Sequence, residues 1–69
     1  MDKPDWKNAP WWANYLAQDI EGPWWWYEFQ PIYTQSGVWA VTEDKGRAAG
    51  ATPRNARLRK PIESLEERP

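Results

Sequence analysis

The sequence predicts an α+β fold in which one N-terminal amphipathic helix packs on a Trp-rich antiparallel hairpin or three-stranded meander, followed by a short C-terminal helix. Apolar residues at helical spacing come first, and a run of aromatic residues bounded by Gly-Pro and Pro follows them. Two strands alone are marginal in water, so we expect the helix to cover one face of the hairpin. The chain has 69 residues, enough for one small domain.

The N-terminal helix is expected over residues 9–18. Asn8 is a suitable N-cap, and Pro10 falls in the first turn, where its missing N–H leaves no hydrogen bond unmade. Trp12 and Leu16 stand four residues apart, the spacing that places two side chains on the same side of a helix. Gly22 follows in a turn in which we expect a positive φ.

Residues 24–30 predict a strand because aromatic side chains are dense and prolines bound them. Alternation separates two sets of side chains. The set expected in the core is Trp25, Tyr27 and Phe29, and the set expected outside is Trp24, Trp26 and Glu28. A turn over residues 34–37 leads to a second strand over residues 38–42, which is expected to pair with the first. Residues 32–33 and the region after Gly46 are alternative sources of a third strand.

These expectations divide one domain into four parts. Residues 1–7 form an irregular arm from which Trp6 docks on the core, and residues 8–44 form the core of helix and hairpin. Residues 45–60 are a flexible basic segment, and residues 61–69 form a short helix that begins near Pro61.

Several kinds of chemistry lack their usual residues. The chain has no Cys and no His, so a disulfide framework, a thiolate zinc site, a thiol nucleophile and an imidazole base are excluded. Its carboxylate pairs fit turns better than a metal cage. We therefore expect a non-enzymatic protein with no cofactor and no metal. Mean hydropathy is −0.99, and no apolar leader is evident, so we expect a cytoplasmic protein without a membrane span.

Charge is segregated along the chain. Residues 1–44 carry seven acids and two bases, residues 45–60 carry six bases and no acid, and the last nine residues carry three acids and one base. The net charge of −1 thus conceals an acidic body and a basic segment. The residues of that segment expected to contact a protein partner or nucleic acid are Arg47, Arg54, Arg57, Arg59 and Lys60.

The seven tryptophans are too many for the core of so small a domain. Trp24 and Trp26 share a face with Glu28, and Trp11 falls beside the helix stripe, so we expect these residues at a surface. Exposed Trp near Arg is typical of an interface hot spot. The predicted protein interface is therefore Trp11, Trp24, Trp26 and Glu28.

Three segments carry a pattern. They read Asn8-Ala9-Pro10-x-Trp12-Ala13-x-Tyr15-Leu16-Ala17-Gln18-Asp19, then Gly22-x-Trp24-x-Trp26-x-Glu28 with a later Trp, and Ser64-Leu65-Glu66-x-Arg68-Pro69. This pattern resembles small Trp-rich accessory proteins of tailed phages and prophages. The resemblance implies a compact protein that binds and redirects a bacterial host protein, and thus a location in the host cytoplasm. It does not extend over residues 46–60.

Three functional hypotheses follow. The first is a small protein-binding module, an inhibitor or modulator of a bacterial host protein if the chain is phage-encoded. The second is a nucleic-acid-binding accessory protein that uses the basic segment over residues 45–60. The third is a structural subunit whose Trp face is buried in a homo-oligomer.

Overall fold

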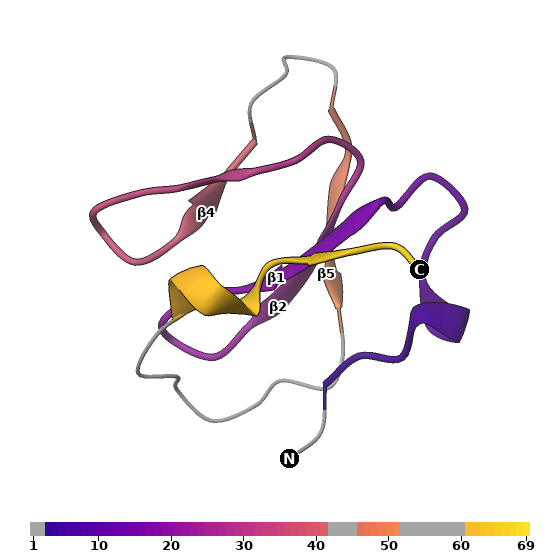
Figure 1. The fold of residues 1–69 in the computed structure, drawn as a ribbon, viewed down its shortest axis with the longest axis horizontal. Helices are drawn as coiled ribbons and strands as arrows, with labels where there is room; N and C mark the ends of the chain where they lie inside the picture. The colour runs from indigo at the N-terminus through magenta and orange to yellow at the C-terminus, as the bar shows by residue number, and fades with distance from the viewer. Residues whose placement is uncertain (1–2, 42–45, 52–60) are drawn as a thin grey trace.

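A computed structural model describes residues 3–41, 46–51 and 61–69 (Figure 1). Within these ranges the chain forms short strands and two 3₁₀ turns and no α-helix. In chain order the elements are η1 Trp6–Asn8, β1 Tyr15–Gln18, β2 Trp24–Tyr27, β3 Ile32–Tyr33, β4 Trp39–Ala40, β5 Ala48–Ala51, η2 Pro61–Ser64 and β6 Glu66–Glu67. The α+β prediction is therefore wrong: the fold is antiparallel sheet.

Four of the strands form one sheet in the order β5-β2-β1-β6, with antiparallel neighbours throughout. β1 and β2 pair from Tyr15 opposite Tyr27 to Gln18 opposite Trp24. The tight turn between them closes with a hydrogen bond of 2.9 Å from the N–H of Asp19 to the carbonyl of Pro23. Gly22 has φ of 111° in this turn, which confirms the expected positive φ.

The predicted helix over residues 9–18 is replaced by a turn and a strand. The chain turns after Pro10, whose carbonyl accepts a hydrogen bond of 3.0 Å from Ala13 N–H, and β1 begins at Tyr15. Leu16, Ala17 and Gln18 are all buried, so β1 is covered on both faces. A strand covered on both faces presents an unbroken apolar run, which periodicity cannot separate from a buried helix. Pairing of β1 with β2 and β6 overrides the local helix propensity.

The strand predicted over residues 24–30 is present over Trp24–Tyr27, but its partners are β1 and β5. The expected pairing with residues 38–42 is wrong. β4 instead pairs with β3 in a separate two-stranded hairpin whose turn contains Gly37, with φ of 90°. Both segments weighed as a third strand are strands, β3 and β5.

The C-terminal helix is also absent, because only the 3₁₀ turn η2 forms before β6 pairs with β1. Ser64 fixes this arrangement: its hydroxyl accepts a hydrogen bond of 2.8 Å from the backbone N–H of Gln18. Beyond β6, the N–H of Arg68 donates to the carbonyl of Asn14 at 2.8 Å. The free edge of β1 thus offers the last residues more backbone hydrogen bonds than one isolated helical turn retains.

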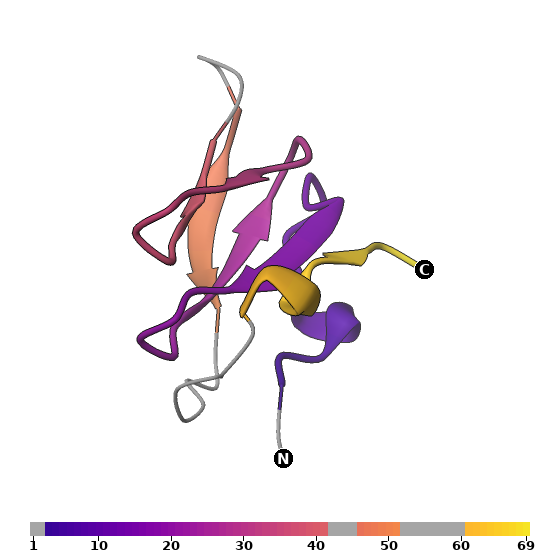
Figure 2. The same ribbon diagram turned by 60° about the vertical axis from the view of Figure 1, so that its left-hand side comes forward.

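Both faces of the four-stranded sheet are covered, as Figures 1 and 2 show. The N-terminal segment packs on one face through Trp6, Ala9, Trp12 and Ala13. The β3–β4 hairpin packs on the other face through Tyr33 and Trp39, against Ala17, Trp25 and Tyr27. The indole N–H of Trp39 donates to the carbonyl of Gln18 at 3.1 Å, which holds the hairpin in place.

The two faces correct the expected inside and outside of β2. Trp24 and Trp26 are 6% and 4% exposed and lie in the core beneath the N-terminal segment. Tyr27 is buried on the opposite face, while Phe29 lies beyond the end of the strand and is exposed. Because β2 is covered on both sides, alternation cannot tell which set is internal. Glu28 follows the last residue of β2, so its charge gave no information about the face.

Candidate functional site

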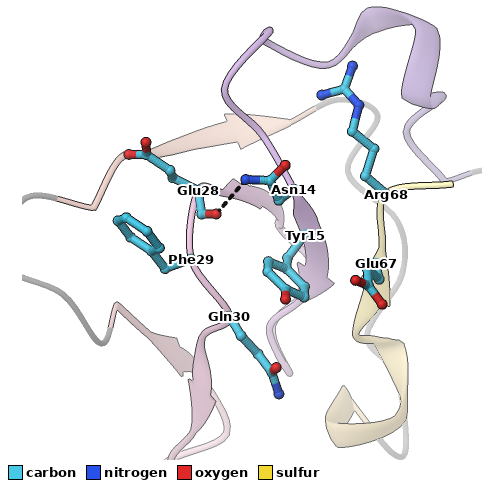
Figure 3. Close-up of a pocket in the computed structure, with 7 residues that line it drawn as sticks. All are labelled: Asn14, Tyr15, Glu28, Phe29, Gln30, Glu67 and Arg68. Atoms are coloured by element: carbon cyan, nitrogen blue, oxygen red, sulfur yellow. Dashed lines mark hydrogen bonds between the residues drawn. The ribbon is translucent and has the colours of Figure 1, made fainter.

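A pocket of about 300 Å³ opens at one end of the sheet, where β1 begins and β2 ends (Figure 3). Its walls come from the start of β1, the segment after β2, and the end of β6 with the residue that follows. The lining residues are Asn14, Tyr15, Glu28, Phe29, Gln30, Glu67 and Arg68. Three segments distant in the sequence therefore build it.

Asn14 fastens these segments together. Its backbone N–H donates to the carbonyl of Tyr27 at 2.9 Å, and its side-chain amide donates to the carbonyl of Glu28 at 2.9 Å. Its own carbonyl accepts the N–H of Arg68 at 2.8 Å. Since these bonds extend the ladders on both sides of β1, the pocket walls stand on a hydrogen-bonded frame.

Two of the charged groups that line the pocket are directed at other parts of the chain. A carboxylate oxygen of Glu28 accepts the backbone N–H of Arg47 at 3.2 Å. The guanidinium of Arg68 donates to the carbonyls of Ala13 and Pro10, at 2.6 and 3.2 Å, and lies 5.7 Å from the ring centre of Trp6. Figure 3 shows both charged ends directed away from Tyr15.

The remaining walls are aromatic, amide and acidic. Tyr15 is half-buried, and Phe29 has 44% of its surface exposed. In Figure 3 the Tyr15 ring lies between Phe29 on one side and Glu67 on the other, with Gln30 beside it. The Glu67 carboxylate makes no ion pair or hydrogen bond within the described ranges. It is the pocket's uncommitted charge in that part of the chain.

Trp11 and Arg47 extend this site outward. Trp11 is 81% exposed, and the Arg47 guanidinium lies over its ring, 4.9 Å from the centroid. Arg47 joins the pocket through Glu28, whose N–H donates to the Arg47 carbonyl at 3.0 Å. We call the pocket together with Trp11 and Arg47 the sheet-end surface.

The sheet-end surface brings together Trp11, Glu28 and Arg47, three of the residues the sequence marked for binding. Trp24 and Trp26 are not surface residues, so their predicted exposure is wrong: they fill the core against Leu16 and Ala51. Arg54, Arg57, Arg59 and Lys60 lie outside the described residues.

Sequence reasoning missed the other pocket residues. The sequence predicts a helix at Tyr15, a core position for Phe29, and a terminal helix over Glu67 and Arg68. Their proximity depends on the pairing of β1 with β6, where Tyr15 stands opposite Glu67. No local signal marks a contact between residues so distant in the sequence.

Outside the sheet-end surface, the carboxylates of Asp19 and Glu66 and the phenol of Tyr27 have shifted pKa values. Burial raises the pKa of Asp19, although hydrogen bonds from the Trp39 backbone N–H, at 2.9 Å, and from the Trp25 side chain lower it in part. Burial, and to a lesser extent the charge of Asp19, raises the pKa of Tyr27.

The pKa of Glu66 is shifted in the opposite direction, below its ordinary value. Burial raises the pKa of Glu66, but hydrogen bonds from Lys3 and Trp6 and the charge of Lys3 outweigh it, so the pKa is lowered overall. Trp6 donates its indole N–H to this carboxylate at 2.6 Å, and Trp6 also meets Trp26 edge-on at 5.0 Å. Glu66 thereby ties the N-terminal segment to β6.

Within residues 3–41, 46–51 and 61–69, no group of three or more Asp or Glu side chains is arranged to hold a metal ion. No helix in those ranges has the length and apolar character needed to cross a bilayer. Comparisons with protein-family models, with curated proteins and with solved structures gave no match.

Proposed function

We propose that this chain is a small non-enzymatic protein-binding module that engages its partner through the sheet-end surface. The observation that carries the proposal is the combination of an exposed Trp11 under Arg47 with an aromatic-walled pocket beside it. Trp, Tyr and Arg dominate binding energy at protein interfaces, where rigid aromatic anchors sit beside pockets.

The support of this surface favours recognition. Asn14 and Glu28 fix its backbone through hydrogen bonds to β2, β5 and β6 neighbours, so little conformational entropy is lost when a partner docks. Trp11 and Phe29 are exposed on this frame. Neighbouring large apolar side chains that remain exposed to water are typical of protein interaction sites.

The identity of the partner is proposed from the sequence pattern. The resemblance of residues 8–19, 22–28 and 64–69 to phage accessory proteins favours a bacterial host protein as the target, in the host cytoplasm. In that setting the module acts by occupying a host surface, as an inhibitor or modulator.

A pull-down from bacterial lysate tests the proposal, run at low and high salt with and without nuclease. The bait is the full chain, as wild type, as Trp11→Ala, and as the matched control Ile62→Ala. Ile62 is also exposed, at 56%, but it lies on η2 outside the sheet-end surface. Near-UV circular dichroism establishes that each bait is folded.

We expect one host protein to be retained by wild type and Ile62→Ala at both salts, and to be lost with folded Trp11→Ala. Equal retention by all three baits would contradict the role of Trp11. Material that disappears after nuclease treatment would replace the proposal with the nucleic-acid hypothesis.

A further inference from the structure

We propose that the pocket of the sheet-end surface receives an arginine side chain of the partner, with its guanidinium on the Tyr15 ring and paired with the Glu67 carboxylate, which stands opposite Tyr15. This inference rests on the proposed function and adds the chemistry of the group that is recognised.

The first argument is charge. The Arg68 guanidinium is directed at the carbonyls of Pro10 and Ala13, so it does not pair with the Glu67 carboxylate. A cationic ligand therefore meets, at short range, a carboxylate that makes no ion pair within the described ranges.

The second argument is the aromatic walls. A guanidinium is planar, stacks on ring faces and is weakly hydrated, whereas an ammonium is compact and holds its water more strongly. The guanidinium also presents paired N–H donors that match one carboxylate. A half-buried aromatic ring opposite one carboxylate therefore suits arginine better than lysine.

The third argument is size. About 300 Å³ corresponds to the liquid volume of roughly ten water molecules, room for one long side chain. It lies at the lower limit of pockets that enclose a small-molecule ligand. One side chain entering from a docked protein fits this volume, and Trp11 and Arg47 provide contacts for the surrounding residues.

The probe is the tripeptide acetyl-Gly-Arg-Gly-amide, titrated into the ¹⁵N-labelled full chain and followed by amide chemical shifts. Its matched control is the same peptide with citrulline, which keeps the shape of arginine and removes the charge. The variant is Glu67→Gln. Its control is Glu63→Gln, an exposed glutamate on η2 that does not line the pocket.

We expect saturable shifts concentrated on the amides of Tyr15, Phe29, Gln30 and Glu67. The Kd should rise about tenfold both for the citrulline peptide and for Glu67→Gln, because a charge-assisted contact is lost. Glu63→Gln should bind as wild type does. Equal binding of the two peptides, an unchanged Kd in Glu67→Gln, or shifts centred elsewhere would overturn the inference. So would the absence of shifts at about 10 mM peptide, where a site with a Kd of about 1 mM is largely filled.

The two tests fail separately. A Trp11-dependent partner in the pull-down without arginine binding would leave the proposed function standing and remove the arginine site. Arginine binding without any Trp11-dependent partner would do the reverse.

Discussion

Glu28 and Arg47 are hydrogen-bonded in both directions: the Glu28 N–H donates to the Arg47 carbonyl at 3.0 Å, and the Arg47 N–H donates to a Glu28 carboxylate oxygen at 3.2 Å. The pair extends the β2–β5 ladder beyond Tyr27 opposite Ala48. It holds Arg47 where its guanidinium covers Trp11. One acidic side chain thus connects the frame of the sheet to the exposed tryptophan.

Replacing Glu28 tests this connection. Glu28→Ala removes the acceptor for the Arg47 N–H and should lower the free energy of unfolding by about 0.5–1.5 kcal/mol. Glu28→Gln keeps an acceptor oxygen at the same position and should stay within about 0.5 kcal/mol of wild type. Urea unfolding measures both values, and an equal loss in the two variants would show that charge, not the acceptor, matters.

Trp26→Ala should unfold the chain. The ring is 4% exposed and packs edge-on against Trp6, so truncation leaves a cavity and is expected to cost about 3–5 kcal/mol. That is comparable to the whole stability of a small domain. Circular dichroism should show lost tertiary signal. A folded Trp26→Ala with an unchanged urea midpoint would return this residue to the surface.

We expect the contribution of Asp19 to the free energy of unfolding to fall as the pH rises. Burial raises the pKa of Asp19 above its ordinary 3.8 in the folded state, so folding favours the protonated form. The stabilisation that comes from this protonation is fully present below pH 3.8 and is lost as the pH rises through the raised pKa of the folded state. Asp19→Asn keeps an oxygen to accept the Trp39 N–H and removes the titration.

The measurement is the difference in unfolding free energy between Asp19→Asn and wild type from acidic to neutral pH. We expect the variant to gain relative to wild type as the pH rises, by about 1 kcal/mol or less for a partly solvated group. A difference that does not change with pH would contradict the raised pKa.

We expect the contribution of Glu66 to the free energy of unfolding to fall as the pH is lowered, the opposite of Asp19. Its pKa lies below the ordinary 4.5, so its stabilising contribution is present above that pH and is lost as the pH falls through the lowered value. Glu66→Gln should cost about 0.5–1 kcal/mol at neutral pH and less in acid, since both Glu66 and Lys3 are partly exposed and water screens the pair. High salt should reduce the neutral-pH loss; insensitivity to both pH and salt would contradict an ionic tie.

The features that the sequence did predict are local ones. Aromatic density and flanking prolines indicate the strand that contains Trp24 and Tyr27. The turn just before that strand predicts a positive φ at Gly22, which the structure has. Docking of Trp6 on the core is confirmed by its contact with Trp26. These depend on backbone preference and apolar area, which a short window contains.

The features that it did not predict depend on distant pairing. Leu16 and Ala17 are buried on opposite faces of the sheet. A strand that is buried on both faces lacks the alternation of apolar and polar residues, so its sequence is also compatible with a buried helix. The contact of Tyr15 with Glu67 follows from a two-residue pairing with no local signature. Of the predicted interface, Trp11 is exposed as expected, whereas Trp24 and Trp26 of β2 are buried. The exposed aromatic residues of the site, Trp11 and Phe29, lie in the segments that flank β1 and β2.

The central claim is that a partner docks on the sheet-end surface. The most direct test is the Kd of the captured host protein for wild type, Phe29→Ala and Ile62→Ala, measured by calorimetry on folded chains. Phe29 and Ile62 are both exposed, at 44% and 56%, but only Phe29 lines the pocket. The account predicts a Kd at least about tenfold higher for Phe29→Ala and unchanged for Ile62→Ala. Equal Kd values for all three chains, or a loss confined to Ile62→Ala, would contradict it.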